Sequence, residues 1–592
     1  MARIFIKLIK NLIVSIRGHE ILCLFSLIYF VYLISSMPTG AGDTIPASLL
    51  PFSILENHNL YLDQFFYYFE SNSLLPYFAR EIDGHLLSNY PIVTPILITP
   101  LYALAFLFIK LNNIPLDMFN PAFGSIVLIM GKLSSSLIAS FSAIFVFLSL
   151  KELTNKRTAT IVTLIFAFAT NTWAISSREL WQHGLVELFL AMSIYLVLIN
   201  EKQKSEMNII YLGIISGFFI FNRPPDSILL IPIIYYILTM KDRRIIYYFS
   251  FMALSSAPFF LYNMHYFGSL FGGYAGLASG IHFNFNMITG LVGLLASPSR
   301  GIFIYTPIIL FSIVGYSKIS KLSNGIVKKF LLISGISILG QILIYSAFVI
   351  WWGGWSYGPR FLTGILPVLF IFLGLYLKDA NVNIKQKKNL KIISIFSILL
   401  IWSIFVQFVG VFYYPNGDWD GSPSIDPYPE KCWYWNDTQI MRAFNAGITS
   451  PGNYIKNLQT IANPPCDIIT EGNLGKGWYG IETWDGTSTR WMKNDSLITI
   501  YSPENRTATL SLNALSFYRN RTLEISCNGV HLARVAVPTG FVNVNVPMHL
   551  AKGENTIRLH VPEGCERPRD IKELNNVDSR CLSIAMQNVT VT

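Results

Sequence analysis

Charged residues are scarce in this 592-residue sequence: Asp, Glu, Lys and Arg make up 13% of it, whereas apolar residues make up 52%. A soluble multidomain protein of this length needs a more polar surface. The composition therefore excludes a soluble enzyme and predicts a polytopic α-helical membrane protein. The net charge of +10 arises largely from short loops between apolar segments, so it indicates membrane orientation and not nucleic-acid binding.

Cysteine is also rare, and it is unevenly distributed. Of the six cysteines, Cys23 lies in the first apolar segment and the other five follow residue 412, namely Cys432, Cys466, Cys527, Cys565 and Cys581. If this tail faces an oxidising compartment, two disulfides with one cysteine left over can form. Cys565 with Cys581 is the favoured pair.

Several catalytic motifs are missing. The sequence has no Gly-rich phosphate loop, HExxH helix, cysteine metal cluster or GxSxG elbow at a convincing spacing. Nucleotide-dependent and hydrolytic chemistry is therefore disfavoured.

What the sequence does contain is a series of apolar segments of bilayer-crossing length within residues 1–412. Lys7, Lys10 and Arg17 precede the first of them and place the N-terminus in the cytoplasm. The sequence predicts eleven spans, at about 20–36, 122–150, 158–175, 183–199, 209–222, 226–240, 245–262, 302–316, 330–350, 361–377 and 391–412. Four loops rich in Lys and Arg then also lie inside, at 201–206, 241–244, 317–329 and 378–391, and the C-terminal tail lies outside.

The first outer loop, residues 37–121, is unusually long and mixes aromatic with polar clusters, as interfacial helices do. Within it, 91–109 is apolar enough to span. We expect it to lie in or re-enter the outer leaflet, because an odd number of crossings must separate Asp43 from the cytoplasmic loop at 151–157. Its prolines at 91, 95 and 100 make it the weaker span.

Asp43 lies just beyond the first span, where a carboxylate can meet both a lipid-borne and a water-soluble substrate. It is therefore a candidate general base. The alternative is a helix N-cap or a solvated loop carboxylate.

The four predicted outer loops between later spans each carry one arginine, against the orientation rule: Arg178, Arg223, Arg300 and Arg360. Four guanidinium groups on the side of Asp43 suggest a site for an anion such as a lipid phosphate. The alternative is snorkelling or pairing with neighbours such as Glu179 and Asp226. Side chains in the same motifs are predicted to contact substrate, namely Glu179, His183, Trp351, Trp355 and Tyr357.

Two ionisable residues fall within predicted spans. Lys132 lies about ten residues into its span, near mid-membrane at roughly 1.5 Å per residue, where an ammonium group is costly unless paired. We predict that it contributes to the phosphate site. Glu187, one turn after His183, is a similar functional candidate. The alternative is that it pairs with a neighbouring group.

Beyond Tyr413 the composition changes. Residues 413–470 are predicted to form an irregular connector, and 471–592 contain short alternating runs separated by Gly- or Asn-bearing turns, which predict an extracytoplasmic antiparallel β-sandwich of jelly-roll type. The tryptophans of 477–491 suit sugar stacking or, equally, core packing.

Residues 1–412 resemble the membrane-embedded GT-C glycosyltransferases, which include protein O-mannosyltransferases and lipid A aminoarabinose transferase. The resemblance rests on span order, on the acidic residue just after the first span and on the interfacial first loop. It implies transfer of a sugar from a polyprenyl-phosphate carrier to an acceptor outside the cytoplasm. Asp43 matches the first-loop acid and Lys132 the basic residue of the second span. The family often has a paired acid in that loop, so Glu81 or Asp83 remains an alternative base or the second carboxylate.

The mechanism that follows is an inverting single displacement in which Asp43 accepts the acceptor's proton and the arginines stabilise the departing phosphate. Because the sequence shows no dedicated metal cage, we expect no cofactor and no obligatory metal. We expect a bacterial inner-membrane enzyme that acts on O-antigen or a related lipopolysaccharide glycan. A protein acceptor is the alternative, and a flippase for lipid-linked saccharide is the rival of another class.

Overall fold

The computed structural model describes residues 20–35, 40–71, 77–118, 120–275, 287–379, 387–449, 474–484, 487–502, 505–574 and 578–591. The chain divides into two compact units. The first, here the helical unit, comprises residues 1–51, 88–99 and 128–454, and the second comprises 52–87, 100–127 and 455–592.

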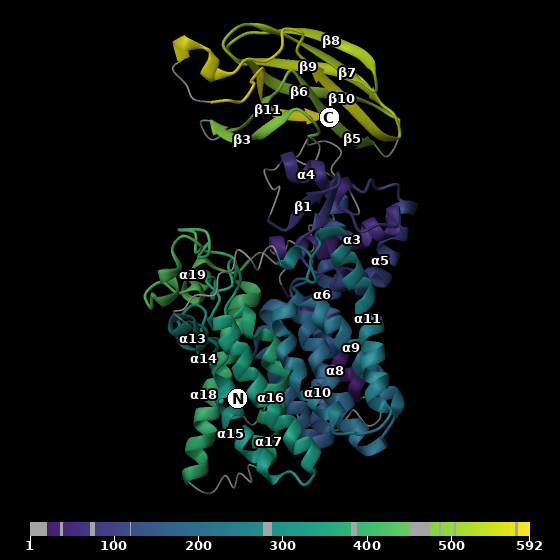
Figure 1. Ribbon diagram of the computed structural model, residues 1–592. Helices are drawn as coiled ribbons and strands as arrows, with labels where there is room; N and C mark the ends of the chain where they lie inside the picture. Colours follow the sequence, from purple (N-terminus) through teal and green to yellow (C-terminus); the bar gives the residue numbers. More distant parts are fainter. Residues whose placement is uncertain are drawn as a thin grey trace. The chain divides into compact units, whose positions relative to one another are not determined.

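The helical unit is built from roughly parallel rods, which Figure 1 shows for α8, α9, α16 and α18. Its helices are α2 (Glu20–Leu33), α7 (Lys156–Phe168), α8 (Gln182–Gln203), α9 (Glu206–Asn222), α10 (Ile231–Leu238), α11 (Arg244–Phe267), α13 (Met287–Ala296), α14 (Ile302–Tyr305), α15 (Leu310–Ser317), α16 (Gly325–Ser346), α17 (Leu366–Asp379), α18 (Lys387–Phe412) and α19 (Gln439–Ala446). Three more helices, α3 (Ile45–Asn57), α5 (Val93–Leu111) and α6 (Pro121–Leu153), contribute residues to both units.

Local chemistry explains where these helices begin and how closely they pack. Asn155 caps α7 by accepting a hydrogen bond from the Thr158 amide, and Asn324 caps α16 in the same way. Where α9 crosses α11, a Cβ at Gly213 would lie 2.5 Å from the Tyr248 carbonyl oxygen. Glycine is therefore required for the two backbones to approach.

The described residues contain seven helices that are long and apolar enough to cross a membrane, together with four shorter apolar ones. The shorter ones are Glu20–Leu33, Glu206–Asn222, Pro224–Leu238 and Met287–Ala296. The protein is thus a multi-pass membrane protein, as predicted. The number of crossings, eleven from the sequence, stays a prediction, and the short helix α13 was not expected.

Proline bears on two of the apolar segments that the sequence analysis considered. The segment 302–316 is interrupted, because Pro307 begins the short 3₁₀ helix η5 (Pro307–Ile309) between α14 and α15. The segment 91–109 forms the continuous helix α5, one of the seven of sufficient length. Pro91 precedes that helix and Pro95 falls in its first turn, where no intrahelical donor is lost, so only Pro100 removes a bond. The prolines were a weaker argument against a span than we expected, and the re-entrant placement stays a prediction.

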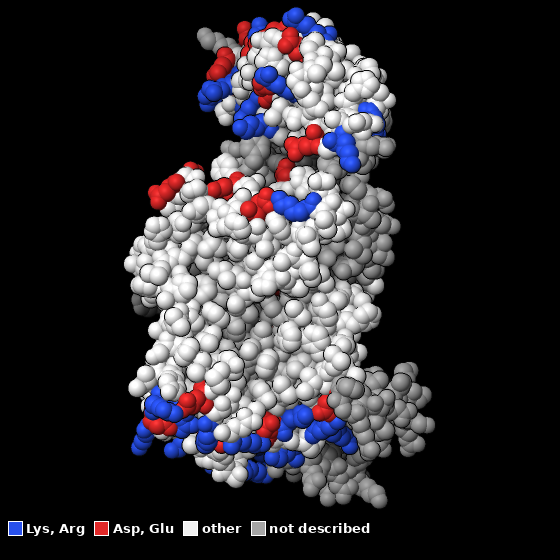
Figure 2. Space-filling view, turned by 90° about the vertical axis from the view of Figure 1, so that its right-hand side faces the viewer, with Lys and Arg blue, Asp and Glu red and all other residues white. Residues whose placement is uncertain are grey.

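Basic side chains gather at one end of the helical unit. Figure 2 shows Lys and Arg along the lower edge, beneath a broad surface that carries no charge on this face. Ion pairs join the start of α2 and two basic loops: Glu20 pairs with Lys151 and with Lys156, and Lys202 pairs with Glu152 at 2.5 Å.

The second unit contains a hairpin of β1 (Ala79–Ile82) and β2 (His85–Ser88, whose last residue belongs to the helical unit) and, near the C-terminus, two antiparallel sheets. One sheet has the order β3-β4-β11-β6-β9 and the other β5-β10-β7-β8. Their strands are β3 (Trp478–Trp484), β4 (Thr487–Met492), β5 (Asp495–Ser502), β6 (Arg506–Ser516), β7 (Arg521–Cys527), β8 (Val530–Val537), β9 (Val542–Leu550), β10 (Gly553–His560) and β11 (Ile584–Val591).

The two sheets share one apolar core, to which β6 contributes Leu510 and Leu512 and the opposite sheet contributes Leu523 and Ile557. Burial alternates along β6 and β9, as the sequence pattern requires for strands with one face buried. The predicted antiparallel sandwich is confirmed. Trp478 belongs to this core, so that one of the tryptophans considered for sugar stacking packs inside the sandwich.

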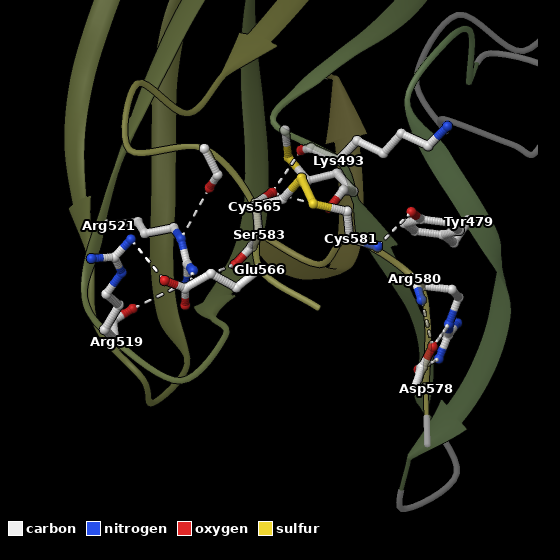
Figure 3. Close-up of a disulfide and its surroundings, with 12 residues drawn as sticks. Tyr479, Lys493, Arg519, Arg521, Cys565, Glu566, Asp578, Arg580, Cys581 and Ser583 are labelled. Atoms are coloured by element: carbon white, nitrogen blue, oxygen red, sulfur yellow. Dashed lines mark hydrogen bonds and ion pairs between the residues drawn. A yellow bond between two sulfur atoms is a disulfide. The ribbon is translucent and has the colours of Figure 1, made fainter. Parts of the chain in front are cut away.

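The predicted disulfide between Cys565 and Cys581 is present, with Cα atoms 5.2 Å apart (Figure 3). Beside it the Cys581 amide donates to the Tyr479 hydroxyl at 3.0 Å, and the Arg580 guanidinium lies over the Tyr479 ring. Of the other tail cysteines, Cys432 and Cys527 are free and buried, and Cys466 lies outside the described residues. Burial raises the pKa of the Cys432 thiol to about 11, so it stays protonated near neutral pH.

Candidate active site

Asp43 lies in a tight turn between α2 and α3, the 3₁₀ helix η1 (Gly42–Thr44). One carboxylate oxygen, Oδ2, accepts a hydrogen bond from Nη1 of Arg360 at 2.7 Å, and the other, Oδ1, accepts from the Tyr90 hydroxyl at 2.7 Å. The side chains of Arg360 and Asp43 are 10% and 17% exposed. The two residues that the sequence predicted as base and phosphate ligand are therefore one ion pair, although 317 positions separate them.

Arg360 is the last residue of the glycine- and tryptophan-rich motif 351–360 and the first of the 3₁₀ helix η7 (Arg360–Ile365). Gly353, Gly354 and Gly358 of this motif all have positive φ, which only glycine adopts without strain. The Arg360 guanidinium carbon lies 4.3 Å from the centroid of the Trp181 ring. This contact fixes the guanidinium plane, while the buried Nε has no hydrogen-bond partner.

The turn that carries Asp43 is held by Glu179. Oε2 of Glu179 accepts hydrogen bonds from the Ala41 amide and the Thr44 hydroxyl, both at 3.2 Å, so it contacts the residues on either side of Gly42 and Asp43. Sequence reasoning placed Glu179 at the substrate. The structure places it on the backbone that positions the candidate base.

Lys132 is fully buried in α6, where its ammonium group donates to the Ser35 hydroxyl at 2.7 Å and to the Ser177 carbonyl at 3.1 Å. It thus joins the end of α2 to the loop that carries Arg178 and Glu179. These contacts are structural, and a role at the donor phosphate stays a prediction. Glu187, also buried, accepts from the Thr172 hydroxyl at 2.7 Å, which is the local pairing considered as its alternative.

Two of the four arginines make extensive contacts within the protein. Arg178 donates to the carbonyls of Gly410 and Tyr414, at 3.1 and 2.9 Å. Arg300 donates to the Trp352 carbonyl at 2.8 Å and to Asp420 at 2.6 Å, with further bonds from its terminal nitrogens.

Burial raises the pKa of Asp420 and Arg300 opposes that rise, as expected for a carboxylate withdrawn from water beside a cation. These contacts favour the structural alternative for Arg178 and Arg300, whose role at a phosphate stays a prediction.

Arg223 and His183 lie closer to the Asp43–Arg360 ion pair. The guanidinium carbons of Arg223 and Arg360 are 5.6 and 5.5 Å from the centroid of the same Phe361 ring, and the His183 ring centroid is 6.1 Å from it. Arg223 is also 3.3 Å from Asp226 and donates to the Tyr345 hydroxyl at 2.9 Å. The buried Nδ1 of His183 has no hydrogen-bond partner. Two cationic side chains and an imidazole therefore surround one aromatic ring beside the candidate base.

The remaining predicted residues have different surroundings. Trp351 is buried and Trp355 is 52% exposed. Tyr357 is buried and donates to the Val406 carbonyl at 2.7 Å, a structural contact. Glu81 and Asp83 are exposed in the β1–β2 hairpin of the second unit.

Tyr90 is the residue that sequence reasoning missed. It directly precedes Pro91, and its amide donates to the Ser88 hydroxyl at 3.0 Å. In the sequence, nothing distinguishes Tyr90 from the other tyrosines of the first loop. Among the described residues no group of three or more His, Cys, Asp or Glu could hold a metal ion. The expected independence from a metal stays a prediction.

Each of the four arginines lies at the helix end opposite a basic loop: α8, α9, α14–α15 and α17 run between such a loop and Arg178, Arg223, Arg300 and Arg360, respectively. Arg360 precedes α17 and Lys378 lies in its last turn, where it donates to the Leu153 carbonyl at the end of α6. Likewise α2 runs from Glu20, paired with Lys151, to the region of Ser35, which contacts Lys132 two thirds of the way back along α6. The common face predicted for Asp43 and the arginines is therefore present in the fold.

The helical unit thus carries, at one end, a partly buried carboxylate paired with a guanidinium group and further cationic side chains nearby. Residues 123–262 match the family model described as dolichyl-phosphate-mannose-protein mannosyltransferase. The match agrees with the predicted resemblance to membrane glycosyltransferases that use a lipid-phosphate-linked sugar. No curated protein matches the chain.

Solved structures show more distant likenesses. ArnT from Cupriavidus metallidurans bound to undecaprenyl phosphate is 10% identical, with a TM-score of 0.40, over 67% of this chain and 70% of its own. A family 35 carbohydrate binding module from an environmental isolate is 16% identical, with a TM-score of 0.15, over 20% of this chain and 86% of its own. A family 35 carbohydrate binding module from Clostridium thermocellum is 14% identical, with a TM-score of 0.14, over 19% of this chain and 88% of its own. At these scores and identities the likenesses do not identify an activity.

Proposed function

We propose that this enzyme transfers a sugar from a polyprenyl-phosphate carrier to an acceptor hydroxyl on the extracytoplasmic side of the inner membrane. The observation that carries the proposal is the partly buried Asp43 carboxylate directly beside Arg360, whose Nε has no partner. A proton acceptor and a planar cation are the groups that displacement at an anomeric phosphate requires. The description of the matching family, which names a dolichyl-phosphate donor, supports the same donor class.

In the proposed reaction Asp43 accepts the proton of the acceptor hydroxyl as its oxygen bonds to the anomeric carbon. The bond between that carbon and the phosphate oxygen breaks, and the electron pair leaves with the carrier phosphate. Arg360 stabilises the charge that develops there, and Arg223, which contacts the same Phe361 ring, adds to the positive field. A single displacement of this kind inverts the anomeric configuration.

For the acceptor we propose a surface glycan such as O-antigen. A protein hydroxyl is the second candidate, and the family description, which names a protein acceptor, favours it. Incubating membranes that contain the enzyme with radiolabelled polyprenyl-phosphate sugars distinguishes the two, because the label moves either to polysaccharide or to protein. If the label crossed the membrane still attached to the carrier, the flippase alternative would replace both.

Asp43→Asn tests the base. It keeps the shape and a hydrogen-bond acceptor for Arg360 but removes the proton acceptor, so we expect transfer to fall by about 10² to 10⁴, with expression and insertion unchanged. Single-turnover transfer by the purified variant measures this. Wild-type turnover would make Asp43 structural, and Glu81 and Asp83 would then be tested.

A further inference from the structure

We propose that the Asp43–Arg360 ion pair is a latch that the donor phosphate opens: the phosphate competes with Asp43 for the Arg360 guanidinium, so the base is released for the acceptor only when donor is bound. The inference rests on the proposed function, because it takes the ligand to be a phosphate and Asp43 to be the base.

The first step of the argument is the occupancy of the carboxylate. Oδ2 contacts Arg360 and Oδ1 contacts Tyr90, both at 2.7 Å. An acceptor hydroxyl that approaches Asp43 meets a carboxylate with a short hydrogen bond to each oxygen. A group that competes for the Arg360 guanidinium weakens the hydrogen bond to Oδ2 and so makes that oxygen a better acceptor for the hydroxyl proton.

The second step is that neither partner can move far. The Arg360 guanidinium stacks on Trp181 at 4.3 Å and lies beside Phe361. The turn of Asp43 is fixed on both sides by Glu179, through the Ala41 amide and the Thr44 hydroxyl. A phosphate can therefore replace the Asp43 carboxylate at Arg360 through side-chain rotation alone, without movement of helices.

The third step is charge balance. Separating two charged side chains that are 10% and 17% exposed is costly without another counter-ion, since each charge loses its partner where water is scarce. A phosphate replaces the carboxylate as counter-ion at no loss of charge pairing, and a fork of N–H donors suits its oxygens. The partnerless, buried Nε of Arg360 is an additional donor for such an anion.

This competition makes an unusual prediction: removing the base should tighten carrier binding. Asp43→Asn retains only a neutral acceptor for Arg360, which binds it less strongly than a carboxylate does. The affinity of the purified enzyme for undecaprenyl phosphate in detergent should rise about tenfold, the factor for one charge-assisted hydrogen bond. Asp43→Ala should show the same direction and serves if the Asn variant does not fold.

Three controls separate the latch from other effects. Asp63→Asn, which removes an acid paired with His85, should leave the affinity unchanged. Uncharged undecaprenol should bind wild type and variant alike. In an Arg360→Gln background Asp43→Asn should no longer tighten binding. This double-mutant cycle isolates the interaction between Asp43 and Arg360.

Unchanged or weaker phosphate binding by both Asp43 variants overturns the latch. Tightening that persists without Arg360 also overturns it, since it would report only the removal of a nearby negative charge. If Asp43→Asn is inactive with unchanged binding, the latch alone fails. If it retains wild-type transfer, the assignment of Asp43 as the base in the proposed function fails, whatever the binding result.

Discussion

Arg360 pairs with Asp43, stacks on Trp181 and has a buried Nε without a hydrogen-bond partner. Arg360→Lys keeps the charge but loses the planar fork. If a charge-assisted hydrogen bond to the donor is lost, the cost is about 1.5–3 kcal/mol, or roughly tenfold to more than a hundredfold in the donor KM.

The donor KM and the thermal unfolding temperature should be measured on one preparation of Arg360→Lys. A lower unfolding temperature with an unaltered donor KM would show that Arg360 only holds its loop.

Glu179 acts at the same scale, through the backbone of the Asp43 turn. Glu179→Ala removes the acceptor of the Ala41 amide and the Thr44 hydroxyl, so the turn is free to shift. Because a displacement of about 1 Å can cost about 10² in rate, we expect kcat to fall by about that factor.

Glu179→Gln keeps an acceptor oxygen and should recover part of the loss in kcat while the donor KM stays near its wild-type value. An Ala variant with wild-type kcat would place Glu179 outside the positioning of Asp43.

At the scale of the elements, helix direction places Asp43 and the arginines at one end and the basic loops at the other. By the positive-inside rule we expect the basic end to face the cytoplasm. In a background without Cys23 and Cys466, Lys204→Cys and Lys321→Cys, both exposed, should react with an impermeant thiol reagent only in inside-out vesicles. Exposed Trp355→Cys should react only in right-side-out vesicles.

Labelling of Trp355→Cys and Lys321→Cys from the same side would contradict the proposed orientation and with it the extracytoplasmic reaction. The helix α5, whose crossing stays open, makes this experiment informative, because one extra crossing would exchange the sides of every later loop.

At the scale of the whole molecule, the disulfide concerns the stability of the sandwich and not the chemistry of the helical unit. It joins residues 16 positions apart, and a loop of about that length restricts the unfolded chain by roughly 3 kcal/mol. The double change of Cys565 and Cys581 to Ala should therefore lower the free energy of unfolding of the sandwich by about that amount, measured by denaturant unfolding of the full chain.

Sugar transfer to a soluble acceptor should be unaffected by loss of the disulfide, and exposed Cys23→Ser should change neither quantity. Loss of transfer in a variant whose helical unit remains folded would show that the sandwich takes part in the reaction.

The sequence by itself determined the membrane class, most helices, the alternation of the strands and the Cys565–Cys581 disulfide. These features follow from local periodicity, span-length apolar runs and a short separation along the chain. It also singled out Asp43 and Arg360, because an acid and a cation beside a span are unusual. Proline interrupted 302–316 where hydropathy alone predicted one span, because hydropathy does not register a lost backbone donor.

Only the tertiary structure decided what each charge contacts. It paired Asp43 with Arg360 across 317 positions, assigned Tyr90 to the same carboxylate, and gave the guanidinium of Arg300 to Asp420 and backbone carbonyls. The physical reason is that a side chain's partner depends on how helices distant in the chain pack together. Periodicity specifies which face of a helix is apolar, but it carries no information on which polar group of another helix will lie within 3 Å of it.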